Sequence, residues 1–223
     1  MSYLPFYLSI NAQDTNLYHN TPCTGDTPVL TASRDDAKVY ELPHFHAEVT
    51  VQDTVTASGV HRVVTSVTNR GETPLCLDAV SSLFVGDIGA DLSSERAVFD
   101  RRFLLHEAPG TWQGEAQWTH GYVEDLGLYS TYNHNHMTAI RRSSVGTWST
   151  GVQYPLFLLE DTLTHECWFF EIETGTGWYA ECDLCGVKAQ AAIGVMLSGA
   201  FEANDGWHCV LAPGETYTAV PAV

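Results

Sequence analysis

Apolar and polar residues alternate regularly along parts of this chain, which limits the folds that it can adopt. In residues 45–52 (FHAEVTVQ), the odd positions are apolar and the even positions are polar. Successive side chains of a β-strand point to opposite faces, so this pattern predicts a strand with one buried face. Residues 60–68 are rich in β-branched side chains, which also favour strands.

Turn residues divide these segments into strands. Residues 60–68 run into Asn69-Arg70-Gly71, a turn signal, and residues 75–85 follow as a return strand. We therefore predict a hairpin over residues 60–85. Further strands are expected at 154–159, 166–174 and 216–220, the last one after a turn at 212–215.

Evidence for helix is sparse. Residues 187–198 are alanine-rich, but Gly186, Gly194 and Gly199 interrupt them, which favours a strand. Many short strands without βαβ alternation predict an all-β antiparallel sandwich of two large packed sheets. A chain of 223 residues with 44% hydrophobic residues is long enough to form one domain, which we place over residues 1–223.

The charge balance excludes some partners. Asp and Glu number 27 against 10 Lys and Arg, a net charge of −17. Such a chain repels nucleic acid and anionic membrane surfaces. The first residues carry no basic segment, and no stretch approaches the roughly 20 apolar residues needed to cross a bilayer. We expect no membrane contact and a cytoplasmic protein, and hence free thiols at the six cysteines, which are Cys23, Cys76, Cys167, Cys182, Cys185 and Cys209.

Aromatic and carboxamide residues gather in the middle of the chain. Residues 106–118 include Trp112, Gln113, Glu115 and Trp118, and Trp148 follows further on. Sugars stack on aromatic rings and bond to planar amides and carboxylates, so these five residues are candidates for carbohydrate contact. The tryptophans fit a core or a subunit interface equally well.

Other motifs indicate no catalytic or metal centre. Glu107 and Glu115 could form a glycosidase pair only if they lay about 5–9 Å apart, which their spacing does not establish. The pairs His44/His46 and His134/His136 could each give two metal ligands from one strand, as in a cupin-like metalloenzyme. Cys182 and Cys185 form a C-x-x-C without a second pair. Since the nucleophile motifs G-x-S-x-G, S-x-x-K and H-E-x-x-H are missing, we predict no catalytic residue, no metal and no cofactor.

Several segments occur in the order found in one enzyme family. They are 95–97 (ERA), 112–118 (WQGEAQW), 144–150 (SVGTWST), 154–156 (YPL), 159–161 (LED), 170–173 (FEIE), 177–179 (GWY), 197–199 (LSG) and 211–217 (LAPGETY). In this order they resemble the N-terminal domain of glycoside hydrolase family 36 α-galactosidases. Residues 67–75 (VTNRGETPL) also fit that domain, whereas the first 35 to 45 residues match poorly.

The resemblance implies a β-supersandwich that precedes a (β/α)₈ barrel. In the family both catalytic aspartates belong to the barrel, on motifs such as Lys-Trp-Asp, which is absent here. The implied partners are this barrel, an α-galactoside oligosaccharide and further subunits of a homo-oligomer.

Three hypotheses follow. The first is a non-catalytic N-terminal domain that supports hydrolysis of α-galactosides through scaffolding, oligomerisation and contacts at the substrate entrance. The second is a free-standing carbohydrate-binding module that uses Trp112, Trp118, Trp148 and Trp178. The third is a cupin-like metalloenzyme that uses the His-x-His pairs.

Overall fold

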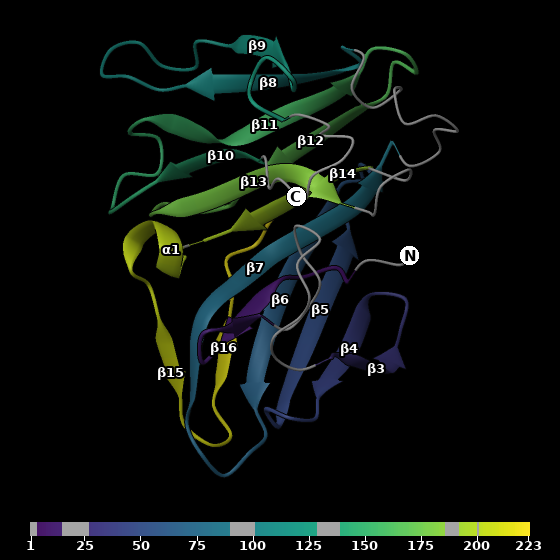
Figure 1. The fold of residues 1–223 in the computed structure, drawn as a ribbon, viewed down its shortest axis with the longest axis vertical. Coiled ribbons are helices and arrows are strands. Elements are labelled where there is room, and N and C mark those ends of the chain that lie inside the picture. Colours follow the sequence, from purple (N-terminus) through teal and green to yellow (C-terminus); the bar gives the residue numbers. More distant parts are fainter. Residues whose placement is uncertain (1–3, 15–26, 90–100, 129–138, 186–191, 200) are drawn as a thin grey trace.

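The computed structural model describes residues 4–14, 27–89, 101–128, 139–185, 192–199 and 201–223. In these residues the chain is almost entirely β-structure, with one short helix, α1 (Glu202–Asp205). The molecule is elongated and its strands form two layers (Figure 1). Every pair of neighbouring strands in the described part is antiparallel, which confirms the predicted fold class.

One layer is a seven-stranded sheet in the order β10-β13-β14-β7-β1-β2, in which β15 also pairs with β7. Its strands are β1 (Leu8–Ile10), β2 (Gln13–Asp14), β7 (Leu75–Ile88), β10 (Ala139–Ser144), β13 (Trp178–Cys185), β14 (Ala192–Ser198) and β15 (Cys209–Leu211). The longest strand, β7, runs through both halves of the molecule (Figure 1). Its first half pairs with β1 and β15, and its second half pairs with β14.

The facing layer is divided into two sheets rather than forming the single large sheet that we expected. A four-stranded sheet has the order β12-β11-β8-β9, and a five-stranded sheet has the order β16-β6-β5-β4-β3. The strands of the first are β8 (Phe103–Pro109), β9 (Thr119–Tyr122), β11 (Gln153–Asp161) and β12 (Cys167–Glu171). Those of the second are β3 (Val29–Ser33), β4 (Ala37–Leu42), β5 (Ala47–Val55), β6 (His61–Asn69) and β16 (Thr216–Thr218).

Each of these two sheets covers one half of the seven-stranded sheet with its own apolar core. Phe103, Leu159 and Trp178 belong to the core beneath the four-stranded sheet. Val49 and Leu77 belong to the core beneath the five-stranded sheet. The partly buried Leu83 of β7 packs against both cores, so the two halves share one continuous interior.

The last residues of the chain join the two sheets of the divided layer. Ala222 pairs with Val63 near the start of β6 and with Ile172 just after β12. Its amide and carbonyl bond to those of Val63, and Val223 exchanges two backbone hydrogen bonds with Glu171. Ala222 is fully buried. We call residues 221–223 the seam, because they form the backbone connection between the four- and five-stranded sheets.

The predicted hairpin over residues 60–85 is wrong in its pairing. Strands do form on both sides of the turn, as β6 and β7, but β6 pairs with β5 and β16, whereas β7 lies in the opposite layer. The apolar faces of the two strands meet across the core, where Val67 and Leu77 pack in one cluster. The buried Asn69 fixes the crossing, since its side-chain amide donates to the carbonyls of Thr73 and Leu211.

The other predicted strands are present with shifted ends. The strand expected at 45–52 is β5 and begins at Ala47, because His46 adopts a left-handed backbone with φ of 50°. Of residues 187–198, the described part forms the strand β14, which confirms strand over helix there. No helix among the described residues has the length and apolar character needed to span a membrane.

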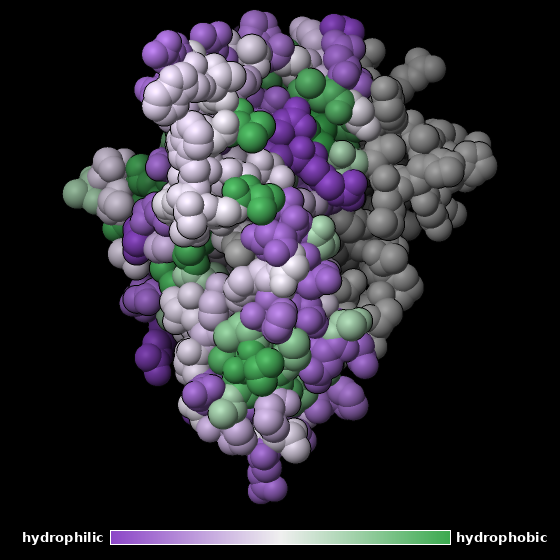
Figure 2. Space-filling view, turned by 90° about the vertical axis from the view of Figure 1, so that its left-hand side faces the viewer, coloured by the Kyte–Doolittle hydropathy of each residue, from purple (hydrophilic) through white to green (hydrophobic). Residues whose placement is uncertain are grey.

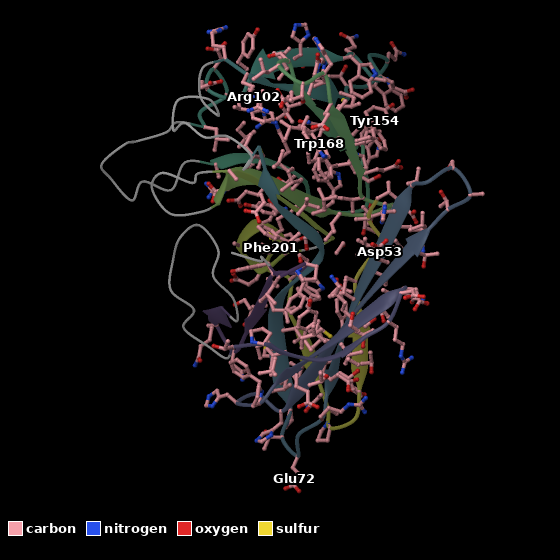
Figure 3. The ribbon with its side chains drawn as sticks, turned by 90° about the vertical axis from the view of Figure 1, so that its right-hand side faces the viewer. Asp53, Glu72, Arg102, Tyr154, Trp168 and Phe201 are labelled. Carbon is pink, nitrogen blue, oxygen red and sulfur yellow. The ribbon has the colours of Figure 1, made fainter. Side chains whose placement is uncertain are left out.

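A buried ion pair lies at the end of the four-stranded sheet opposite to the β8–β9 loop. Arg102 and Asp161 are 4% and 1% exposed, and the guanidinium donates two hydrogen bonds to the carboxylate. Figure 3 labels Arg102 in the upper half of the molecule. Burial alone would raise the pKa of Asp161, but hydrogen bonds from Arg102 and from the amides of Leu163 and Thr164 lower it to about 2.

Candidate functional site

Two loops at one end of the sandwich carry all five candidate contact residues. Residues 110–118 connect β8 to β9, and residues 145–152 connect β10 to β11. Both loops lie on the left-hand side of Figure 1. They touch at their bases, where the Gly110 amide donates to the Val152 carbonyl at 2.9 Å. A β-carbon at Gly110 would lie 2.5 Å from the Thr150 carbonyl oxygen, so only glycine permits this approach.

Several exposed large hydrophobic side chains gather on these two loops. Trp112 is 80% exposed, Trp148 is 52% exposed, and their ring centres lie 6.4 Å apart in an edge-to-face arrangement. Val145 and Val152 are 60% and 69% exposed in the second loop. We call these four residues the aromatic corner. Figure 2 looks onto this side of the molecule, where hydrophobic atoms form separate patches among hydrophilic ones.

Hydrogen bonds hold the loop that carries Trp148 in place. The Trp148 indole N–H donates to Thr150 Oγ1 at 3.0 Å, and Ser144 Oγ donates to the Trp148 carbonyl at 2.8 Å. The buried Trp178 donates its indole N–H to the Ser149 carbonyl at 2.7 Å, which ties this loop to the core. The ring of Trp148 is therefore held in place without a ligand, as a contact surface requires.

The polar candidates lie in the first loop. Gln113 and Glu115 are exposed, and Gln113 has a left-handed backbone with φ of 64°. Trp118 is 52% exposed and lies next to the start of β9. The structure thus brings Trp112 and Trp148 into contact, and it leaves Gln113, Glu115 and Trp118 on the same loop as Trp112. An exposed apolar surface of this kind is typical of a binding site for a sugar or for another protein surface.

The carboxylate of Glu107 is buried and forms an ion pair with Arg142. Glu107 lies in β8, is 8% exposed and faces the interior of the sandwich. Arg142 of β10 donates to its carboxylate at 2.5 Å and 2.8 Å, and Gln153 of β11 adds a weaker contact at 3.4 Å. Glu115, by contrast, is exposed in the loop. The Glu107 carboxylate is therefore held in a buried ion pair, whereas Glu115 lies in an exposed loop, so the two do not face each other as a glycosidase pair.

The remaining sequence motifs form no metal or redox centre among the described residues. His44 and His46 occupy the turn between β4 and β5 instead of one face of a strand, and His134 and His136 lie outside the described residues. Cys182 is buried within β13, whose last residue is Cys185, so the C-x-x-C lies inside a strand and not at a strand–helix junction. Among the residues that the structure describes, no group of three or more His, Cys, Asp or Glu side chains could hold a metal ion.

Comparison with known proteins gives matches in structure alone. No protein-family model matches the sequence, and no curated protein matches it. The galactosidase domain of the α-galactosidase–sucrose kinase AgaSK superimposes with a TM-score of 0.65 at 16% identity, over 96% of this chain and 26% of that one. The α-galactosidase of Lactobacillus brevis gives 0.62 at 14% identity, over 97% and 26%. The family 36 α-galactosidase AgaA of Geobacillus stearothermophilus gives 0.63 at 15% identity, over 100% and 30%.

The fold and the two loops therefore define an antiparallel β-sandwich domain with an exposed aromatic surface. More particularly, the chain has the fold of one part of the family 36 α-galactosidases. This likeness of fold confirms the resemblance that the sequence motifs indicate. The chain spans only about a quarter to a third of the length of these enzymes.

Proposed function

We propose that this chain is the non-catalytic N-terminal sandwich domain of an α-galactosidase-like glycoside hydrolase. In this proposal, a separate (β/α)₈ barrel hydrolyses terminal α-galactosides, and the sandwich supplies scaffolding and subunit contacts. The observation that carries the proposal is the coverage. Solved α-galactosidases match at least 96% of this chain, while this chain accounts for 26–30% of theirs. The ion pair between Glu107 and Arg142 supports a structural role for the carboxylate nearest to the loops.

The isolated chain is expected to release no nitrophenol from a nitrophenyl α-galactoside, because the proposal assigns both catalytic aspartates to the barrel. The measurement is a spectrophotometric assay with a complete family 36 enzyme as positive control. Turnover that persists through repeated purification, and that follows the protein peak, would overturn the non-catalytic assignment. The reading frame gives a second test, since it should continue into a barrel that carries two catalytic aspartates.

We further propose that the full hydrolase is a cytoplasmic homo-oligomer. Support for a reducing compartment comes from Cys76, Cys167 and Cys209, which form no disulfide bond within the part of the chain that the structure describes. Support for subunit contacts comes from the exposed apolar side chains of the aromatic corner, since such patches commonly become buried in assemblies.

A second role favoured by the exposure of Trp112 and Trp148 is direct contact with an oligosaccharide. Trp112→Ala and Trp148→Ala are each expected to weaken raffinose binding at least about fivefold, because loss of one aromatic contact costs roughly 1 kcal/mol. Calorimetric titration with galactose, melibiose and raffinose at millimolar concentration measures this. Phe169→Ala removes an aromatic ring that is 47% exposed in β12, outside the two loops, and is the matched control. Equal losses in all three variants, or no heat with the wild-type chain, would contradict sugar contact at the corner.

A further inference from the structure

Two histidines that belong to neither His-x-His pair face each other on the outer side of the four-stranded sheet. His106 of β8 lies directly opposite His120 of β9 in the antiparallel register. The two strands run side by side at the top edge of the molecule (Figure 1). The neighbours of His106 along β8, Leu105 and Glu107, are buried inside the sandwich, so His106 points outward. His120 is exposed.

The separation of the rings suits a shared metal ion. The ring centres of His106 and His120 are 5.4 Å apart and the ring planes are inclined by 38°. Two imidazoles bound to one tetrahedral ion through Zn–N bonds of about 2.0–2.1 Å place their ring centres roughly 5 Å apart. The separation of the two rings therefore matches the separation that one shared ion requires.

A carboxylate already orients one of the rings. His106 Nε2 lies 2.8 Å from an oxygen of Glu160, which belongs to the adjacent strand β11. When Nε2–H donates to this carboxylate, the neutral ring presents the lone pair of Nδ1 to a ligand. Histidines that bind metals almost always donate their second N–H to such an acceptor, which fixes the tautomer and raises the basicity of the ligating nitrogen.

The nearby thiol is a weaker candidate ligand. Cys167 of β12 lies opposite Glu160 and is exposed. Burial of the sulfur and the charge of Glu160 both raise the pKa of this thiol. Since a metal binds the thiolate, the thiol does not compete well with imidazole near neutral pH. Imidazole nitrogens suit zinc, copper and nickel rather than magnesium or calcium.

We propose that His106 and His120 bind one divalent transition-metal ion, with Glu160 as a positioning residue and water in the remaining coordination positions. Because the described residues provide no group of three ligating side chains, the site has two protein ligands and binds more weakly than a four-ligand structural zinc site. The site is independent of the proposed glycosidase role. It binds an ion on the outer surface of the sheet and takes no part in cleavage of a glycoside.

Isothermal titration of the full chain with zinc chloride tests the site. We expect one ion per chain, and at least tenfold weaker binding for His106→Ala and for His120→Ala. Glu160→Ala should weaken binding about tenfold, the loss typical when an outer carboxylate is removed, and Glu160→Gln should restore part of it. A merely structural role for Glu160 would leave zinc affinity unchanged while altering stability.

Matched controls separate this pair from the other histidines. His61→Ala and His208→Ala remove exposed histidines elsewhere, and a variant with both His134 and His136 replaced removes the second sequence pair. All three should bind zinc like the wild type. Circular dichroism confirms that each variant is folded, and the electron paramagnetic resonance spectrum of bound Cu²⁺ should show two nitrogen ligands that the double variant His106→Ala/His120→Ala lacks. Unchanged zinc affinity in the folded double variant, or no binding to wild type at 1 mM zinc, overturns the proposal.

Discussion

Replacing Asp161 with asparagine is expected to lower the free energy of unfolding by about 3–5 kcal/mol, the usual loss when one partner of a buried ion pair is removed. Arg102 and Asp161 are 4% and 1% exposed, so the guanidinium would stay in the interior beside a neutral amide. The carboxylate also accepts the amide hydrogens of Leu163 and Thr164 and so shapes the turn that follows β11. Equilibrium unfolding in urea measures the change.

The matched control is Asp125→Asn, which breaks an exposed ion pair of the same chemistry. Asp125 pairs with Arg101, and their side chains are 52% and 60% exposed. Exposed pairs contribute about 0–1 kcal/mol, so this variant should stay close to wild type. If Asp161→Asn lowers the free energy of unfolding no more than Asp125→Asn does, burial of the ion pair does not make it important for stability.

The same carboxylate makes the stability depend on pH. Its pKa is lowered from 3.8 to about 2 in the folded chain, so the folded state binds this proton less readily than the unfolded state. The contribution to stability is therefore complete above about pH 5 and is lost as the pH falls through the folded pKa near 2. It amounts to roughly 2 kcal/mol. Between pH 5 and pH 2 the Asp161→Asn variant should lose correspondingly less stability than the wild type.

Deleting the seam, residues 221–223, should cost about 5 kcal/mol. The deletion removes two backbone hydrogen bonds between Val63 and Ala222, two between Glu171 and Val223, and one from Glu173 to Pro221. Each contributes roughly 0.5–1.5 kcal/mol, and the deletion also uncovers the edges of β6 and β12. Thermal and urea unfolding measure the loss, and hydrogen exchange at the amides of Val63 and Glu171 should become faster.

Ala222→Gly separates backbone pairing from side-chain packing at the seam. It keeps the hydrogen bonds with Val63 and removes one buried methyl group, for an expected cost of about 1 kcal/mol. A deletion that costs no more than Ala222→Gly would show that the seam does not hold the two sheets together.

Much of the strand content could be predicted from the sequence, whereas the strand pairing could not. The alternation in β5 and β6 identifies strands and their buried faces, because side-chain direction follows from the backbone alone. It does not identify the neighbour of a strand. Val67 and Leu77 are buried equally well in a hairpin or in two facing layers, and the outcome depends on Asn69, whose side chain bonds to the distant Leu211.

For the candidate sites, too, the sequence indicates the suitable residue types but not which of them come together. The sequence identified Trp112 and Trp148 as residue types suited to sugar contact, but their contact depends on the close approach of Gly110 to Thr150, which no local pattern shows. His106 and His120 were missed altogether, because they meet through strand register and not through spacing in the chain. Prediction of β8 and β9 as a hairpin with that register would have found the pair.

The position of the seam has a consequence for how this domain is made. Because Ala222 and Val223 pair with Val63 and Glu171, the divided layer cannot close before the ribosome has synthesised the chain through Val223. Contacts between segments so distant in the chain slow folding, and until they form, the edges of β6 and β12 are open to other strands. Newly made chains should thus pass through an aggregation-prone stage that lasts until residues 221–223 have emerged and paired.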